Sequence, residues 1–318
     1  MSVQLGAAQP MAPVAVANIE TALTQSWREL ARKQGTTLVH ACSLTLLIWV
    51  DQEAAGRGVL EAVNQLAGKH PIRAIVVSPE EGMAEGSVAA WFANGCDAQT
   101  VDPICSEEIL LRAHPQSTES LASAVRGLLV ADLPIYLWWR GGSPSGHPLF
   151  SALCGMADRV VVDSIRFGDG PAALDTLRRL VQRNPGRVTV RDLNWQRTEP
   201  WRNALAACFD DHDVLTMLPH LDRCSVTYSG TDGSSASARS MLIYGWLASR
   251  FPALRGRVRI APGKHWADIA HGRIVAISLN SAANKCSLML VRQQSPTGIT
   301  AEARALDGRV MRRWTFQA

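Results

Sequence analysis

The sequence predicts an α/β protein with a mostly parallel, Rossmann-like sheet that has helices on both faces, followed by a smaller C-terminal α+β domain with antiparallel strands. Between residues 16 and 211, apolar segments of strand length alternate with segments of helical periodicity, which is typical of a parallel sheet. After residue 211 strand-like segments follow one another, which indicates antiparallel pairing. We therefore expect a flexible tail over 1–15, a Rossmann-like domain over 16–211 and a C-terminal domain over 212–318, with the boundary at 211 or as early as about 165.

The first elements form a β-α-β unit. Asn18 can cap a helix that ends at Gly35, and the β-branched and leucine-rich segment 37–50 suits a strand covered on both faces. A helix over about 59–66 and a strand over 72–77 follow. Such units cross over right-handed into a parallel sheet.

An edge hairpin is predicted next. Residues 86–112 contain two extended segments around Asn94-Gly95, a strong hairpin signal. Ser117 or Thr118 then caps an amphipathic helix.

In the remaining sequence, predicted strands and helices first alternate, and the strands then follow one another. The first group comprises strands 135–139, 159–162 and 187–191, with helices 148–154 and 171–183 and a helix that turns Trp201, Leu205 and Cys208 inward. The second group comprises a strand near 222–229, a helix over 236–250 and an antiparallel meander over 273–279, 286–292 and 298–303.

Composition excludes several classes of protein. Hydrophobic residues make up 47% and charged residues 19% of the 318 residues, which excludes a disordered chain. The formal charge of +4 is small and scattered, so we expect neither a nucleic-acid nor a membrane partner. The longest apolar segment, 41–50, has about half the length of a membrane span, and the N-terminus has no signal-peptide pattern.

The seven cysteines are odd in number and widely spaced. This pattern favours a reducing compartment, and we expect a cytoplasmic protein. Cys96 and Cys105 are the nearest pair and could meet across the hairpin.

Common catalytic and cofactor motifs are missing from the sequence. It contains no Walker loop, no G-x-G-x-x-G, no H-E-x-x-H and no G-x-S-x-G. The histidines lack the spacing of a metal site. We therefore expect no bound cofactor, no metal and no enzymatic activity.

Polar side chains follow three predicted strands at the point where each strand ends. The clusters are Trp138-Trp139-Arg140-Gly141, Asp163-Ser164-x-Arg166 and Asp192-x-Asn194-Trp195. If the strands are parallel, the clusters share the carboxyl edge of the sheet, where open α/β sheets bind ligands. They could bind an anion or dock another protein.

The same residues could instead have purely structural roles. Asp163 and Asp192 could cap helices, and the glycines could form turns. Trp138 and Trp139 face opposite sides of a strand, so both could fill the core, although Trp and Arg also dominate interface hot spots.

The turn Gly230–Ser235 is a second candidate. It precedes a helix, whose N-terminus can bind an anion with help from Arg239 or Lys264. The alternative is a flexible turn with a serine cap.

Several segments carry a resemblance to a known family. They are L-L-V-A-D-L-P-I-Y-L-W-W-R-G at 128–141, C-S-E-E-I at 105–109, A-D-R-V-V-V-D-S at 157–164, D-L-N-W at 192–195, T-x-P-W-R at 198–202 and G-W-L-A-S-R at 245–250. In this order they resemble the OpcA family, the assembly or activator proteins of glucose-6-phosphate dehydrogenase. The resemblance covers about residues 105–250.

The resemblance implies a non-catalytic partner of glucose-6-phosphate dehydrogenase in the oxidative pentose phosphate pathway. From it and the edge clusters we expect ten partner-binding residues: Trp138, Trp139, Arg140, Gly141, Asp163, Ser164, Arg166, Asp192, Asn194 and Trp195. Some relatives are linked to thioredoxin, a role that would need a redox-active cysteine pair. Two alternatives remain, namely an enzyme or sensor for a sugar phosphate or nucleotide at the same edge, and a structural subunit whose tryptophans fill the core.

Overall fold

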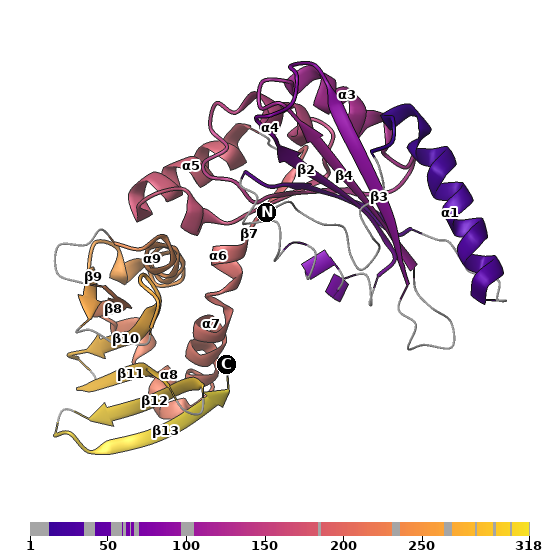
Figure 1. The fold of residues 1–318 in the computed structure, drawn as a ribbon. Coiled ribbons are helices and arrows are strands. Elements are labelled where there is room, and N and C mark those ends of the chain that lie inside the picture. Colours follow the sequence, from indigo (N-terminus) through magenta and orange to yellow (C-terminus); the bar gives the residue numbers. More distant parts are fainter. Residues whose placement is uncertain are drawn as a thin grey trace. The chain divides into compact units, whose positions relative to one another are not determined.

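The computed structural model divides into two units (Figure 1). It describes residues 13–34, 42–51, 59, 62–63, 65–66, 70–96, 105–183, 186–230, 236–263, 269–283, 285–294, 297–305 and 307–317. The first unit comprises Met1–Val162 and Leu180–Arg191, and the second comprises Asp163–Arg179 and Asp192–Ala318. The predicted boundary, at residue 211 or as early as about 165, stays a prediction.

The first unit is built on a mostly parallel sheet, as the sequence predicts. Its strands are β1 (Leu44–Trp49), β2 (Ile72–Pro79), β3 (Val88–Cys96), β4 (Cys105–Ala113), β5 (Ile135–Trp139), β6 (Arg159–Val162) and β7 (Thr189–Asp192). The strand order is β3-β4-β2-β1-β5-β6-β7. β1 pairs in parallel with β2 and β5, β2 with β4, and β5 with β6, whereas the edge strand β3 is antiparallel.

The central strands are mostly apolar and buried along their length, because both faces of the sheet are covered. In β2, seven of the eight residues are buried, and Leu46, Ile48 and Val76 share one core cluster with Val59 and Val63. Part of the helix expected over 59–66, and residues 37–41 of the expected strand, lie outside the described residues.

Five further helical segments connect or precede these strands. They are η1 (Val16–Asn18), α1 (Ile19–Gln34), α3 (Thr118–Gly127), α4 (Pro148–Cys154) and α5 (Gly170–Arg183). The spacing of Leu174, Leu177 and Val181 predicts that all three face inward in α5, but Val181 is 55% exposed. Ser117 precedes α3 as expected, but its hydroxyl accepts a hydrogen bond from the backbone of Gly86 and none from α3.

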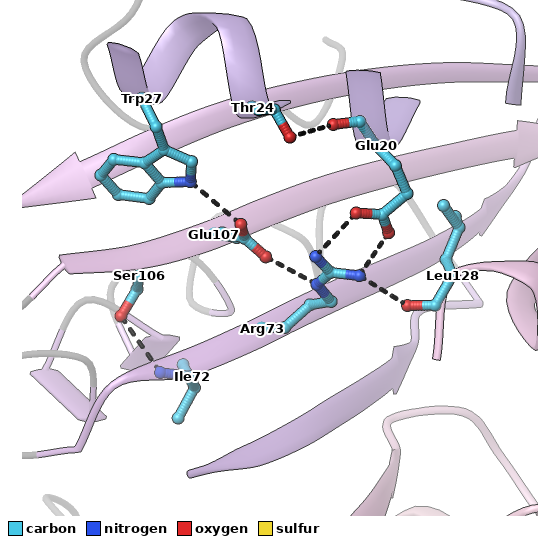
Figure 2. A network of polar contacts seen from close by, with 8 residues as sticks. All are labelled: Glu20, Thr24, Trp27, Ile72, Arg73, Ser106, Glu107 and Leu128. Carbon is cyan, nitrogen blue, oxygen red and sulfur yellow. Dashed lines mark hydrogen bonds and ion pairs between the residues drawn. The ribbon is translucent and has the colours of Figure 1, made fainter. Parts of the chain in front are cut away.

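A buried ion-pair network joins α1 to the sheet (Figure 2). Arg73 donates from Nε to Glu107 Oε2 at 2.6 Å and from Nη1 to Glu20 Oε1 at 2.5 Å, and Trp27 Nε1 donates to Glu107 Oε1 at 3.0 Å. Arg73 and Glu107 are only 5% and 1% exposed. Burial by itself would lower the pKa of Arg73, but the bonds to Glu20 and Glu107 outweigh it and raise the pKa. Charges at this depth are tolerated only when they are paired.

β3 and β4 have the antiparallel pairing expected for a hairpin, but Asn94-Gly95 does not form a turn. Asn94 and Gly95 lie inside β3, opposite Glu107 and Ser106. The amide of Asn94 donates to Ser26 Oγ at 3.0 Å, which ties β3 to α1. Pairing with a long partner strand overrides the local turn preference of Asn-Gly.

The second unit is built on a six-stranded sheet in the order β13-β12-β11-β10-β8-β9. The strands are β8 (Arg223–Ser229), β9 (Val258–Gly263), β10 (Ile274–Ser281), β11 (Cys286–Gln293), β12 (Gly298–Ala305) and β13 (Val310–Gln317). β10 to β13 form the expected antiparallel meander, β8 pairs antiparallel with β10, and β9 is parallel to β8. The two edge strands, β9 and β13, were not predicted from the sequence.

Most of the helical segments of the second unit contribute apolar side chains to a core cluster with this sheet. The helical segments are η3 (Ser164–Arg166), α6 (Leu193–Gln196), α7 (Glu199–Cys208), α8 (His212–Leu215), η4 (Leu218–His220), α9 (Ala238–Arg250) and η5 (Pro252–Leu254). Trp201, Leu205 and Cys208 of α7 face inward as predicted. They pack with Ile243 of α9 and Leu288 of β11 in one cluster, so α7 belongs to the core of the second unit.

Candidate functional site

A cluster of four rings lies at the end of β5. We call Trp49, Trp139, His147 and Phe150 the tryptophan cluster. Trp49 and Trp139 are opposite each other in the parallel register of β1 and β5, and their rings stack with centroids 5.2 Å apart. His147 and Phe150 meet Trp139 edge-on at 4.9 and 5.0 Å. Trp139 is 1% exposed, so it is a core residue that packs beneath the end of β5.

The turn after β5 is shaped by this cluster. Trp139 Nε1 donates to Gly142 O at 3.0 Å, and the Gly142 amide donates to Asp51 Oδ2 at 3.1 Å. A Cβ added to Gly141 would lie 3.0 Å from Trp139 Nε1 and 3.1 Å from Trp49 Nε1. A side chain at position 141 would therefore press on both indoles, which would have to shift by a few tenths of an ångström to make room.

Trp138 and Arg140 form a partly buried pair. Trp138 packs against a core cluster that contains Ile48 and Val76. The Arg140 guanidinium lies 5.0 Å from the centroid of the Trp138 ring, within the range of a cation–π interaction. The Arg140 amide also donates to Trp49 O at 2.9 Å, which anchors the backbone of the turn.

Burial lowers the pKa of His147 below its ordinary value of 6.5. Its Nδ1 is buried without a hydrogen-bond partner among the described residues. A charged imidazole would be costly in these surroundings, so His147 contributes to the tryptophan cluster as a neutral ring.

A second group of polar residues lies in the second unit and centres on Asp192. Its carboxylate accepts hydrogen bonds from the Ser164 amide at 3.0 Å, the Ser164 hydroxyl at 2.7 Å and the Asn194 amide at 3.0 Å. The bond from Asn194 caps α6, so the capping role considered for Asp192 is confirmed. Ser164 is fully buried, and its hydrogen bonds therefore matter for stability.

Asn194 extends this network toward α9. Its amide nitrogen donates to Ser164 Oγ at 3.1 Å, and its Oδ1 accepts from Arg239 Nε at 2.9 Å. Both Asn194 and Arg239 are buried, at 1% and 8% exposure. We call Ser164, Asp192, Asn194 and Arg239 the polar network.

Asp163, Arg166 and Trp195 lie beside the polar network. Asp163 makes no capping hydrogen bond; Arg197 binds it through both terminal nitrogens at 2.7 and 2.8 Å. The guanidinium of Arg202 lies 4.0 Å from the centroid of the partly buried Trp195 ring. Arg166 is exposed.

The structure thus brings Asp163, Ser164, Asp192 and Asn194 together within the second unit. It places Trp138 and Trp139 on separate faces of β5 within the first unit. The common edge expected for all three clusters stays a prediction, because the first cluster and the other two belong to different units.

The second candidate, the turn Gly230–Ser235, is only partly described. Residues 231–235 and Lys264 lie outside the described residues. Arg239 is described, and its Nε is bound to Asn194. The sequence indicates Arg239 only as a helper at this turn. No local pattern predicts its bond to Asn194, because the two residues lie 45 positions apart.

Burial raises the pKa of several thiols. The pKa of Cys42 is about 11 and that of Cys208 and Cys224 about 12, because desolvation disfavours the thiolate. Such thiols are poor nucleophiles. Cys96 and Cys105 are backbone partners in the β3–β4 register, but their side chains are not described. The described residues give the thioredoxin link no support.

The described residues show neither a cluster suited to a metal ion nor a helix suited to span a membrane. These residues contain no group of three or more His, Cys, Asp or Glu side chains placed to hold a metal ion. Among the described helices, none has the length and apolar character needed to cross a membrane.

Comparison with protein families finds two matching domain models in chain order. Residues 63–179 match the glucose-6-phosphate dehydrogenase subunit N-terminal domain, and residues 188–312 match the C-terminal domain of the same subunit. Both models carry the family name OpcA.

Curated relatives carry the same name. "Putative OxPP cycle protein OpcA" of Synechocystis sp. is 28% identical over 225 residues, which cover 70% of this chain and 45% of the relative. The protein of that name from Nostoc punctiforme is 30% identical over 190 residues, covering 59% of this chain and 39% of the relative. The chain spans less than half the length of these relatives.

Solved structures show only distant likeness. A 3-ketoreductase of Actinomadura kijaniata, KijD10, is 8% identical with a TM-score of 0.43, and the match covers 86% of this chain and 84% of that chain. This likeness is too small to bear on function.

Proposed function

The chain belongs to the OpcA family, and from this we propose that it binds glucose-6-phosphate dehydrogenase in the cytoplasm as a non-catalytic assembly factor and allosteric activator. The observation that carries the proposal is the ordered match of two domain models of a glucose-6-phosphate dehydrogenase subunit over residues 63–179 and 188–312. The names of the curated relatives, which refer to the OxPP cycle, agree with it.

In the first unit, Trp138 and Arg140 are the proposed contact residues. Both are partly exposed at the end of β5, and they are held together by a cation–π interaction. Tryptophan and arginine supply much of the binding energy at interfaces, because each buries a large area and offers hydrogen-bond donors. Trp139 and Gly141 have the supporting role of fixing the turn that presents Arg140.

In the second unit, Arg166 and Trp195 are the proposed contact residues. Arg166 is exposed and Trp195 partly exposed. Ser164, Asp192 and Asn194 are proposed to act indirectly, because their hydrogen bonds to one another hold η3 and α6 in place. Asp163 belongs with them through its ion pair with Arg197.

Activation requires a difference in affinity. A partner shifts the enzyme toward an assembled or active state only if it binds that state more tightly than the others. A tenfold shift needs a difference of about 1.4 kcal/mol, which one arginine or tryptophan contact can supply.

The direct test mixes the purified chain with the dehydrogenase of the same organism. We expect the two to co-elute in gel filtration, and we expect the chain to raise the activity of the enzyme or the fraction of assembled oligomer. Separate elution together with unchanged kinetics would refute the proposal.

Variants test the proposed contact residues. Arg140→Ala and Arg166→Ala should each weaken the complex by about tenfold or more, while far-UV circular dichroism stays unchanged. Arg179→Ala is the matched control, since Arg179 is an exposed arginine on α5 outside the proposed contact residues. If all three variants bind equally, the dehydrogenase contacts the chain elsewhere.

A further inference from the structure

Three arginines gather in the second unit without an ion-pair partner. Among the described residues, no carboxylate forms a salt bridge with Arg239, Arg273 or Arg292. The nearby carboxylate of Asp163 is bound through both oxygens by Arg197. Unpaired arginines are expected in this region, because arginine and lysine outnumber aspartate and glutamate more than twofold over 212–318.

Arg239 is the most deeply buried of the three. It lies in the first turn of α9 and is 8% exposed. Its Nε donates to the neutral amide oxygen of Asn194 at 2.9 Å. Burying a cation against a neutral partner is costly, and an anion bound beside it would offset that cost.

Local contacts place Arg273 and Arg292 near the start of α9. Gly272 precedes Arg273, and a Cβ added there would lie 3.1 Å from Cβ of Ser237, the residue that caps α9. Arg292 Nε donates to the carbonyl of Ile274, the residue after Arg273, at 3.1 Å. These contacts bring the three arginines to one region, at the start of α9 and the start of β10.

The positive charges of these arginines affect one another's pKa values. Desolvation and then the positive charges of Arg197 and Arg273 lower the pKa of Arg239 to about 10. Desolvation and the charge of Arg273 likewise lower the pKa of Arg292. We call Arg239, Arg273 and Arg292 the arginine cluster. Its positive charges repel one another when no anion is bound.

We propose that Arg239, Arg273 and Arg292 form a binding site for the phosphate group of a small metabolite. A guanidinium has five N–H donors. Among the described residues, the guanidinium groups of Arg239 and Arg292 each donate a hydrogen bond from Nε alone, and the guanidinium of Arg273 donates none. A phosphate dianion provides several acceptor oxygens and two charges, which matches arginine donors better than a single carboxylate does. The site does not depend on the dehydrogenase as partner.

Calorimetric titration of the full chain with inorganic phosphate tests the proposal. Sodium chloride and sodium succinate at equal ionic strength separate phosphate binding from general screening and from carboxylate binding. We expect phosphate to bind and to raise the melting temperature, with little effect of the other two salts. Equal effects of phosphate and chloride, or equal binding of succinate, would overturn the proposal.

Two arginine variants complete the test. Arg273→Gln removes an exposed cation of the site and should weaken phosphate binding by about tenfold without unfolding the chain. Arg259→Gln is the control, because Arg259 is exposed on β9 opposite Ser225, away from the arginine cluster. Equal loss in both variants, or no loss in Arg273→Gln, would show that these arginines do not form the site.

Discussion

Arg73 and Glu107 pair inside the first unit, with Nε and Oε2 2.6 Å apart and side chains only 6% and 1% exposed. They lie on the neighbouring strands β2 and β4, directly opposite each other in the parallel register. Glu20 and Trp27 of α1 complete the arrangement, so two ion pairs of Arg73 and one hydrogen bond from Trp27 connect two strands and a helix (Figure 2).

Removal of one partner should therefore destabilise the first unit strongly. Arg73→Met leaves the Glu107 carboxylate buried without its cation, and we expect a loss of about 3–5 kcal/mol in the free energy of unfolding. Urea denaturation followed by tryptophan fluorescence measures it. The double variant Arg73→Met/Glu107→Met should recover much of the loss. A stability equal to wild type in Arg73→Met would contradict the buried pair.

The turn after β5 should not tolerate a side chain at position 141. In Gly141→Ala the new Cβ would press on the indoles of Trp49 and Trp139, and we expect a loss of about 1–3 kcal/mol, visible as a lower melting temperature. Gly82→Ala is the control, since nothing lies within 4 Å of a Cβ added there. Equal melting temperatures for both variants would count against the stacked arrangement.

Asp192→Ala should destabilise the second unit more than loss of an ordinary helix cap. The carboxylate accepts three hydrogen bonds from Ser164 and Asn194, so we expect a loss of about 2–3 kcal/mol. Asp211→Ala removes the cap of α8, whose carboxylate accepts hydrogen bonds from the backbone amides of Asp213 and Val214, and should cost about 1 kcal/mol. Thermal denaturation compares the two, and a smaller effect in Asp192→Ala would be inconsistent with a buried network.

His147 should make stability depend on pH. Burial lowers its pKa below 6.5 in the folded chain, so the unfolded chain binds the proton more readily. Stability is then lost as the pH falls through about 6.5, and the loss levels off below the lowered pKa. The melting temperature of wild type should fall more between about pH 7.5 and about pH 5 than that of His147→Gln. Parallel pH profiles would rule out this role.

Local sequence was enough to predict several elements to the residue. β5, α4 and β6 have the predicted bounds, because apolar runs there end at clear signals such as Pro134, Pro148 and Asp163. The edge strand β13 was missed because it contains Arg312 and Arg313 and is mostly exposed, so it lacks the alternation of a half-buried strand.

Polar contacts between distant segments could not be predicted. Arg73 and Glu107 are 34 residues apart, and a glutamate in a strand ordinarily indicates an exposed position. Asp192 could be predicted as a helix cap from its place before α6, since capping is local. Its bonds to Ser164 depend on the arrangement of two segments 28 residues apart, which no local pattern encodes.

The two units are interleaved along the chain. The polypeptide leaves the first unit after Val162, returns to it at Leu180 and leaves again after Arg191. Cleavage at one position therefore cannot separate the two units. An N-terminal fragment that ends at Val162 lacks β7, and one that ends at Arg191 includes Asp163–Arg179 of the second unit. Fragment studies would need an internal splice that removes Asp163–Arg179 together with everything after Arg191.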